Sequence, residues 1–130
     1  MIVLDASAAI ELLLRTPAAA AIEARLFAPN ETLHAPHLLD IEVSQVIRRY
    51  AAMGELGEGR GSATLEDLCN LPVRRYPHDI LLPRIWALRN NLAAYDAAYV
   101  ALAEALDAVL ITRDKRLAGA AGHQARVALV

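Results

Sequence analysis

The sequence predicts an α/β protein in which a parallel sheet carries helices on both of its faces. Five short stretches have the length of strands, and amphipathic or alanine-rich stretches of helical length lie between them. Strands that alternate with helices in this way form parallel sheets covered on both sides. Because ligands of such sheets bind beyond the carboxyl ends of the strands, polar residues at those ends are the first candidates for a functional site.

The predicted strands are short runs bounded by polar residues, glycine or proline, such as "IVLD", "TLHAP" and "AVLIT". Their lengths of about five residues are typical of strands in globular proteins. The expected strands cover residues 2–5, 32–36, 73–77, 108–112 and 125–130.

The predicted helices follow apolar residues at helical spacing, and capping or helix-breaking residues set their ends. Thr16 and Pro17 start the second helix, and Gly54 closes the third. Ser62 is expected to cap the fourth helix, and Pro83 to lie in the first turn of the fifth. The stretch "GELGEGRG" is predicted to be a loop. The helices are expected at residues 6–14, 17–27, 37–53, 62–71, 79–91 and 94–106, with a short one after residue 113.

The composition fits one domain that spans residues 1–130. With 56% hydrophobic residues the chain can bury a core, and a net charge of −2 gives no general attraction to nucleic acid or anionic membranes. Cys69 is the only cysteine, which excludes an internal disulfide and favours a reducing compartment, so we expect a cytoplasmic protein. The N-terminus lacks the basic segment of a signal peptide, and no apolar run is long enough for a membrane span.

Two aspartates stand at predicted strand ends. Asp5 follows "IVL" directly, and Asp114 follows "AVLIT" after one residue. A charged group next to a buried strand is costly unless something compensates for it, so each aspartate is a candidate for a functional role. The alternative for each is a helix N-cap, a common task for aspartate.

Two further acids lie on helix faces that should be buried. On a helical wheel, Glu42 falls inside the apolar arc that contains Leu38 and Val46, and Asp96 lies at the edge of the apolar stripe that contains Tyr99. An acid on such a face points to the core or to a cleft. The alternatives are a buried Glu–Arg pair for Glu42 and a first-turn aspartate that stabilises its helix for Asp96.

Four carboxylates that converge on one point would repel one another strongly, and divalent cations relieve that repulsion. Oxygen ligands without cysteine or histidine suit Mg²⁺ or Mn²⁺. Active sites that hydrolyse phosphodiester bonds commonly contain clustered acids that bind a hydrated metal ion.

Four sequence blocks resemble those of PIN-domain ribonucleases, in order and spacing most similar to the short VapC-type toxins of bacterial toxin–antitoxin pairs. The blocks are "IVLDASAAIELLL", "PHLLDIEVSQVIRR", "YDAAYVALAEAL" and "LITRDKRL", and they cover essentially the whole chain. The resemblance implies a three-layer α/β/α sandwich with a central parallel sheet. It also implies an endoribonuclease that depends on Mg²⁺ or Mn²⁺, forms a homodimer, and is neutralised by a cognate antitoxin protein.

The resemblance also assigns roles to residues. The four acids of the family match Asp5, Glu42, Asp96 and Asp114, which are implied to be the catalytic and metal-binding residues. Ser7 and Thr112 match hydroxyl residues that support the acids in the family. Their position beside Asp114 makes three cations the expected contacts to RNA phosphate, namely Arg113, Lys115 and Arg116.

Two alternatives stay open from the sequence. One is a phosphatase-like enzyme with a strand-end aspartate as nucleophile, although such enzymes want a second acid two residues later, where this chain has Ser7. The other is a non-catalytic α/β interaction module in which the acids only cap helices and form ion pairs. Metal binding separates the metal-dependent nuclease from the interaction module, because helix caps and ion pairs need no Mg²⁺.

Overall fold

A computed structural model describes all residues, 1–130, and contains one five-stranded sheet in which every neighbouring pair is parallel. The order across the sheet is β3-β2-β1-β4-β5. From the central strand β1 the chain moves outward through β2 to β3, and then returns to the other side of β1 for β4 and β5. The strands are β1 (Ile2–Leu4), β2 (Leu33–Pro36), β3 (Val73–Tyr76), β4 (Val109–Thr112) and β5 (Arg126–Leu129).

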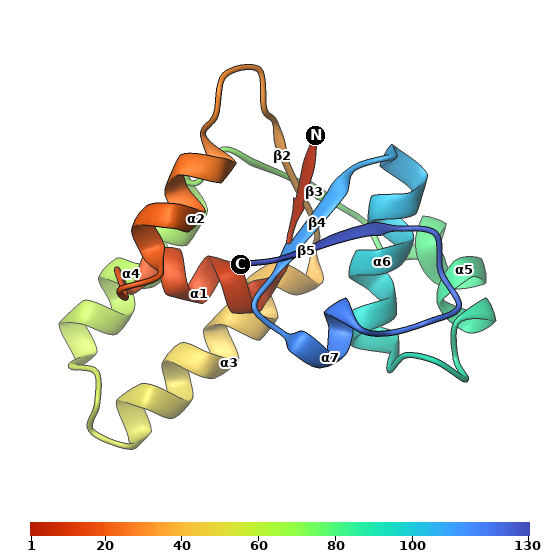
Figure 1. Ribbon diagram of the computed structural model, residues 1–130. Coiled ribbons are helices and arrows are strands. Elements are labelled where there is room, and N and C mark those ends of the chain that lie inside the picture. The colour runs from red at the N-terminus through yellow and green to blue at the C-terminus, as the bar shows by residue number, and fades with distance from the viewer.

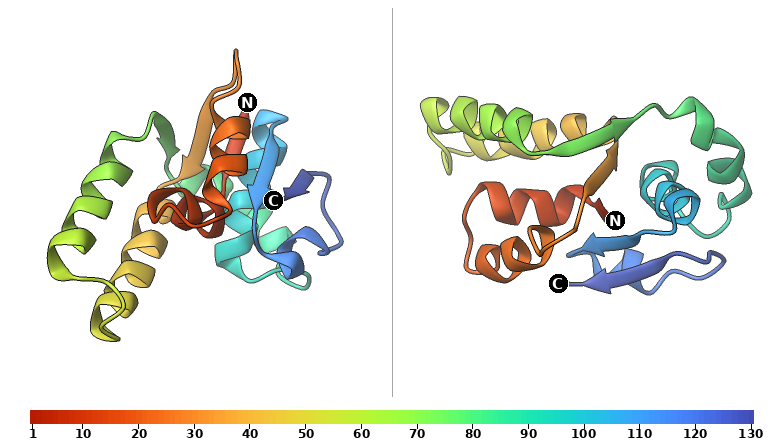
Figure 2. Two further views of the ribbon diagram at one scale, coloured as in Figure 1. Left: turned by 60° about the vertical axis from the view of Figure 1, so that its left-hand side comes forward. Right: turned by 90° about the horizontal axis from the view of Figure 1, so that it is seen from above.

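Helices cover both faces of this sheet, as the sequence predicted. Figure 1 shows α1 to α4 on one side of the sheet and α5, α6 and α7 on the other, and the view from above in Figure 2 shows the same division. The three-layer α/β/α arrangement is therefore confirmed. No helix combines the length and the apolar character needed to cross a membrane. The helices are α1 (Ala6–Leu13), α2 (Ala19–Leu26), α3 (Leu38–Ala52), α4 (Glu58–Asn70), the 3₁₀ turn η1 (Asp79–Leu81), α5 (Leu82–Ala87), α6 (Ala94–Leu106) and α7 (Lys115–Ala118).

The central strand is buried on both faces, and successive side chains go to opposite layers. Ile2 and Leu4 belong to the core formed with α1 to α4, whereas Val3 belongs to the core formed with α6. This alternation is the two-residue period of a strand. Burying each such side chain contributes about 1.5–3 kcal/mol, so β1 is held firmly in place. Asp5, the next residue, is fixed with it.

Two helix starts differ from the sequence prediction. The Thr16 hydroxyl donates to the Glu11 carboxylate instead of capping a helix, and α2 begins only at Ala19. The fourth helix begins at Glu58, inside the stretch predicted as a loop, so Ser62 lies within α4. Side chains farther along α4 are buried in the core formed with α1 to α4. This tertiary packing outweighs the low helix propensity of the glycines in α4.

The helix predicted for residues 79–91 is shorter than expected. It consists of η1 followed by α5, which ends at Ala87, and Pro83 lies in the first turn of α5 as predicted. Asparagine side chains can compete with the backbone for hydrogen bonds, so the pair Asn90 and Asn91 favours a turn at this point. The strands and α6 agree with the prediction to within a residue or two at each end.

Candidate active site

The candidate site lies at the edge of the sheet where the strands have their carboxyl ends, next to the neighbouring strands β1 and β4. Asp5 directly follows β1, and Asp114 follows β4 by one residue. Leu4 pairs with Ile111 across these strands, so the two acids leave the sheet at nearly the same level. The order of the strands reverses between β1 and β4, which makes this the switch point at which parallel sheets bind ligands.

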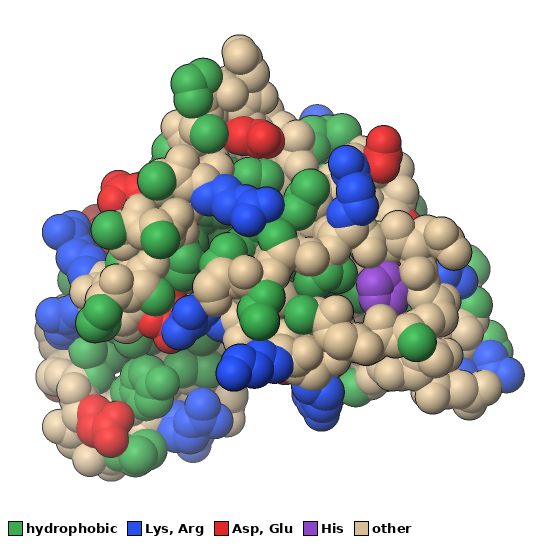
Figure 3. All heavy atoms as spheres, in the orientation of Figure 1, with side chains coloured by type: hydrophobic (Ala, Val, Ile, Leu, Met, Phe, Trp, Pro, Cys, Tyr) green, Lys and Arg blue, Asp and Glu red, His purple; other side chains and the backbone are tan.

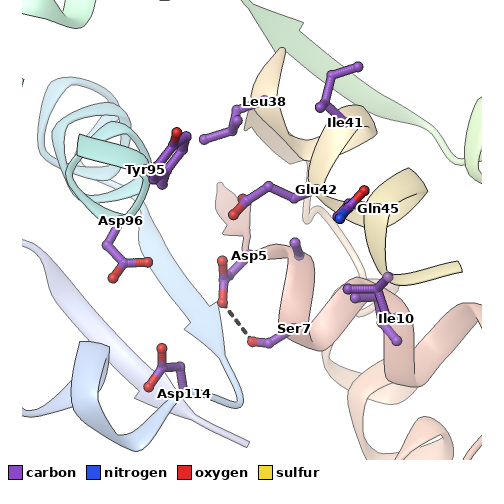
Figure 4. Close-up of a pocket in the computed structure, with 12 residues that line it drawn as sticks. Asp5, Ser7, Ile10, Leu38, Ile41, Glu42, Gln45, Tyr95, Asp96 and Asp114 are labelled. Atoms are coloured by element: carbon purple, nitrogen blue, oxygen red, sulfur yellow. Dashed lines mark hydrogen bonds between the residues drawn. The ribbon is translucent and has the colours of Figure 1, made fainter. Parts of the chain in front are cut away.

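Asp5 is nearly buried, with 6% of its surface exposed, and hydroxyl groups saturate one of its oxygens. Ser7 Oγ donates to Asp5 Oδ2 at 2.6 Å, a bond drawn in Figure 4, and Thr112 Oγ1 donates to the same oxygen at 2.7 Å. Asp5 also occupies the N-cap position of α1, but its side chain makes no capping hydrogen bond. The N-cap alternative therefore does not explain this carboxylate.

Backbone amides orient both of the hydroxyls that contact Asp5. The Arg113 N–H donates to Ser7 Oγ at 2.9 Å, and the Asp114 N–H donates to Thr112 Oγ1 at 3.0 Å. Since each hydroxyl accepts from an amide, its own proton is directed at the carboxylate. Two donors on Oδ2 fix the orientation of the Asp5 carboxylate, and Oδ1 stays free of protein donors.

Glu42 projects from the inner face of α3, and its partner is a tyrosine. The Tyr99 hydroxyl, on α6, donates to Glu42 Oε1 at 2.7 Å, so the alternative of a buried Glu–Arg pair is wrong. Burial raises the pKa of Glu42, the charges of Asp5 and Asp96 add to this rise, and the Tyr99 hydrogen bond opposes it. The ionised carboxylate is therefore held in an unfavourable electrostatic environment.

Asp96 lies in the first turn of α6 and accepts no hydrogen bond from the protein. Its nearest cation is the Arg116 guanidinium, 3.5 Å from Oδ2, on a side chain that is 82% exposed. Burial raises the pKa of Asp96, the charges of Asp5 and Asp114 raise it further, and Arg116 opposes them. Its position in the first turn also lets the α6 dipole stabilise the anion, as the first-turn alternative holds.

Asp114 caps a helix and lines the site at the same time. Its Oδ1 accepts from the Arg116 N–H at 2.9 Å and from the Leu117 N–H at 3.3 Å, which confirms the N-cap alternative for α7. Its Oδ2 accepts no hydrogen bond from the protein and lies 3.8 Å from the Arg116 guanidinium. The cap leaves one oxygen available, so it does not exclude a functional role.

The four acids line a single pocket of about 450 Å³. Figure 4 shows their carboxylates turned toward a common space between α1, α3, α6 and the start of α7. The rest of the wall is largely apolar and includes Tyr95 and Ile41, which are 64% and 69% exposed, and no lysine or arginine lines the pocket. All four acids that the sequence singled out line this one pocket: Asp5, Glu42, Asp96 and Asp114.

Comparisons with known proteins agree on one family. A model of the PIN domain matches residues 2–122 of the chain. The whole chain aligns with a Mycobacterium tuberculosis protein named ribonuclease VapC12 at 46% identity, covering 99% of that protein. It aligns with ribonuclease VapC9 of the same organism at 45% identity, covering 98% of it. The chain belongs to the PIN-domain family.

Solved structures share the fold of this PIN domain. The match to VapBC2 from Rickettsia felis, bound to a promoter DNA fragment, has a TM-score of 0.75 at 14% identity and covers 100% of this chain and 99% of that chain. The match to a toxin–antitoxin complex from Klebsiella pneumoniae has a TM-score of 0.64 at 22% identity and covers 92% of each chain. At these identities the likeness establishes the fold, and the VapC-named relatives place the chain within the family.

The donor set of this PIN domain fits a hydrated divalent cation. The pocket offers carboxylate oxygens without histidine or cysteine, and Asp5, Glu42 and Asp114 each keep one oxygen free of protein donors. No three His, Cys, Asp or Glu side chains are close enough together to bind one ion directly. Mg²⁺ commonly takes one or two carboxylates and keeps several waters, so this arrangement suits Mg²⁺ or Mn²⁺ better than an ion that sheds its waters.

The three cations expected near the site border it without lining it. Arg113 Nη1 donates to the Val130 carbonyl at 2.7 Å, so part of its guanidinium is already engaged, while Lys115 and Arg116 are exposed. In Figure 3, Lys and Arg side chains gather along the lower edge of the molecule, beside the hollow next to the lobe of α3 and α4. Their contact with RNA phosphate stays a prediction.

Sequence reasoning missed Tyr99 as part of the site. It was placed in the apolar stripe of its helix, and the structure indeed buries it completely. A tyrosine on such a stripe needs an acceptor for its hydroxyl, and this requirement was the available signal. The identity of the acceptor depended on the packing of α6 against α3, which the sequence pattern does not give.

Proposed function

We propose that this PIN domain is an endoribonuclease that depends on Mg²⁺ or Mn²⁺ and acts as the toxin of a toxin–antitoxin pair. The observation that carries the proposal is the convergence of four carboxylates on one pocket at the switch point of the sheet. Its support from relatives is the match over the full chain to proteins named as ribonucleases. The names of the Mycobacterium relatives support the reaction class, and the carboxylate oxygens of the pocket support a divalent cation.

In this proposal Asp5 and Asp96 hold the cation, and Glu42 and Asp114 complete or tune its site. When bound, Mg²⁺ or Mn²⁺ lowers the pKa of water and stabilises negative charge at phosphorus. The Ser7 hydroxyl helps to hold the Asp5 carboxylate in a fixed direction. With water as nucleophile, cleavage needs no ribose 2′ hydroxyl, and the product downstream of the cut carries a 5′ phosphate.

The pocket explains why RNA and metal would bind together. Four carboxylates line the pocket, and no lysine or arginine lines it. Without a cation, the pocket therefore repels the negative charge of a phosphodiester. A divalent ion offsets part of that negative charge and gives the phosphate a cation to bind. The exposed Tyr95 ring beside Asp96 offers a surface on which an unpaired base can stack, as in many proteins that bind single strands.

The partners of the toxin follow from the same proposal. We propose that an antitoxin segment binds along the helices at 12–28 and 43–53. A groove of about 540 Å³ between α1, α2 and α4 supports the first of these surfaces. For the homodimer, the exposed apolar side chains of η1 and α5, Ile80, Leu82 and Trp86, are the proposed contact. A strict monomer in light scattering at high micromolar concentration would contradict the dimer. If no protein encoded by the neighbouring gene co-purified with this protein, that result would contradict the antitoxin.

The function is tested by RNA cleavage with and without divalent ions. We expect cleavage of single-stranded RNA by purified protein in millimolar Mg²⁺ or Mn²⁺, its loss in excess EDTA, and its return when the metal is restored. Asp5→Asn protein purified in the same way controls for contaminating nuclease. Undiminished cleavage in EDTA by the wild type, absent from that control, would contradict the metal-dependent mechanism.

A further inference from the structure

Tyr99 reaches the site from the hydrophobic core. Its ring is fully buried in the core on the α6 side of the sheet, together with Val3 of β1 and Leu110 of β4. Its hydroxyl crosses from α6 to α3 and donates to Glu42 Oε1 at 2.7 Å. A ring locked by packing has little freedom, so its hydroxyl is a fixed point against which a longer side chain can be oriented.

Glu42 needs such a fixed point more than the aspartates do. Its side chain has one more rotatable bond than that of aspartate, and it projects from a helix into a half-open pocket. Without a donor, its carboxylate would sample several rotamers. With Oε1 held by Tyr99, Oε2 is left without a protein donor, and Figure 4 shows the carboxylate turned toward Asp5 and Asp96.

The same division of oxygens occurs at two of the other acids. Asp5 has Oδ2 held by two hydroxyls, and Asp114 has Oδ1 held by the amides of α7. In each case one oxygen is tied to the fold and the other is available to the pocket. Tyr99 therefore does for Glu42 what the hydroxyls do for Asp5. Asp96 is the exception, because only the exposed Arg116 side chain approaches it.

The chemistry of the donor also suits a cation site. A tyrosine hydroxyl is neutral, so it orients Glu42 without cancelling the negative charge that attracts a cation. An arginine at this place would form an ion pair and compete with the metal. We infer that Tyr99 is a positioning residue of the site, whose buried hydroxyl holds the Glu42 carboxylate in the direction that binds a divalent cation. The inference rests on the proposed function, since it takes Glu42 as part of the metal site.

The test compares Mn²⁺ binding by Tyr99→Phe and a matched control. Tyr76→Phe removes a hydroxyl that makes a bond of the same length, 2.7 Å to His34 Nδ1, from β3 and outside the pocket. Removing a group that orients a metal ligand commonly weakens metal binding by about 10–100-fold. By calorimetry we expect Tyr99→Phe to bind Mn²⁺ about tenfold more weakly than the wild type, and Tyr76→Phe to bind it as the wild type does. Equal affinity of Tyr99→Phe and wild type would overturn the inference.

A second background separates orientation from general loosening of the fold. In Glu42→Gln protein the charge that Tyr99 orients is gone, so adding Tyr99→Phe should change Mn²⁺ affinity less than twofold. A further tenfold loss in that background would show that Tyr99 acts through the fold and not through Glu42, and would overturn the inference. Wild type that binds no Mn²⁺ would instead overturn the metal-dependent function itself, which is a distinguishable result.

A crystal structure of the Mn²⁺-loaded wild type tests the same point if Tyr99→Phe does not fold. The inference predicts that the Tyr99 hydroxyl still donates to Oε1 and that Oε2 is the oxygen on the side of the ion. A Glu42 carboxylate that has left Tyr99 in the loaded protein would overturn it.

Discussion

Asp5→Asn protein should cleave RNA about a thousandfold more slowly than the wild type while keeping the fold. The asparagine amide oxygen can still accept from Ser7 and Thr112, so the local hydrogen bonds survive, but the free oxygen becomes an amide nitrogen that cannot bind a cation. Losing the cation removes several kcal/mol of transition-state stabilisation, and ~4 kcal/mol corresponds to about a thousandfold in rate. Initial rates on a labelled single-stranded RNA, with circular dichroism to confirm folding, measure this.

Asp107→Asn is the matched control for Asp5→Asn. Asp107 carries the same charge, but its side chain is 96% exposed and lies outside the pocket. Its backbone is left-handed, with φ of 51°, a conformation that asparagine tolerates well. The control should cleave at the wild-type rate. If Asp5→Asn retained more than a tenth of the wild-type rate, Asp5 would not be the central ligand.

Two substitutions at Asp114 should separate its capping role from its role in the pocket. Asparagine is a good N-cap, so Asp114→Asn should keep α7 in place and lose only the free carboxylate oxygen. Asp114→Ala should lose both, with a further cost of about 1 kcal/mol in the free energy of unfolding. We expect both variants to cleave RNA about a hundredfold more slowly, a loss of ~2.7 kcal/mol.

Urea unfolding and initial rates together decide between the two roles of Asp114. Similar loss of activity in both variants, with destabilisation only in Asp114→Ala, supports a direct role for the carboxylate. If Asp114→Asn cleaved like the wild type and only Asp114→Ala lost activity, Asp114 would serve the site solely as the cap of α7.

Three of the four acids were predictable because each violates a local rule of burial. Asp5 and Asp114 follow buried strands, and Glu42 interrupts an apolar helix face. Parallel sheet topology then places the strand-end acids at one edge, so their proximity follows from fold class alone. The helix acids needed the resemblance as well as the wheel, because a first-turn aspartate such as Asp96 is common without any site.

The features that escaped prediction depend on packing between elements. The start of α4 at Glu58 depends on what that helix buries, whereas its local sequence, with Gly57, Gly59 and Gly61, is typical of a loop. The Tyr99 bond to Glu42 joins residues 57 positions apart, and only the docking of α6 against α3 brings them together. Sequence periodicity gives the buried face of a helix but not the partner of a polar atom on that face.

The phosphatase-like alternative loses its basis in the structure. Such an enzyme needs a second acid two residues after its nucleophile, but Ser7 occupies that position and donates to Asp5 Oδ2. The interaction-module alternative explains the Asp114 cap but gives no reason for Asp5, Glu42 and Asp96 to line the same pocket.

Asp96 allows a stability test of the metal site. Its pKa is raised in the folded protein, so the stability that its neutral form provides is present at low pH and is lost as the pH rises through that pKa. At pH 7 the ionised Asp96 is therefore destabilising when no metal is bound, and Asp96→Asn removes the penalty. The gain should be on the order of 1 kcal/mol, or a few degrees in melting temperature, because water and salt screen an open pocket.

Thermal melts of wild type and Asp96→Asn at pH 7, with EDTA or with millimolar Mg²⁺, test most directly whether the four carboxylates form a divalent cation site. In EDTA the variant should melt a few degrees above the wild type. Mg²⁺ at ten times its Kd stabilises the folded wild type by about 1.4 kcal/mol, and it should stabilise the variant much less. Melting curves of both proteins that do not respond to Mg²⁺ would contradict the metal site.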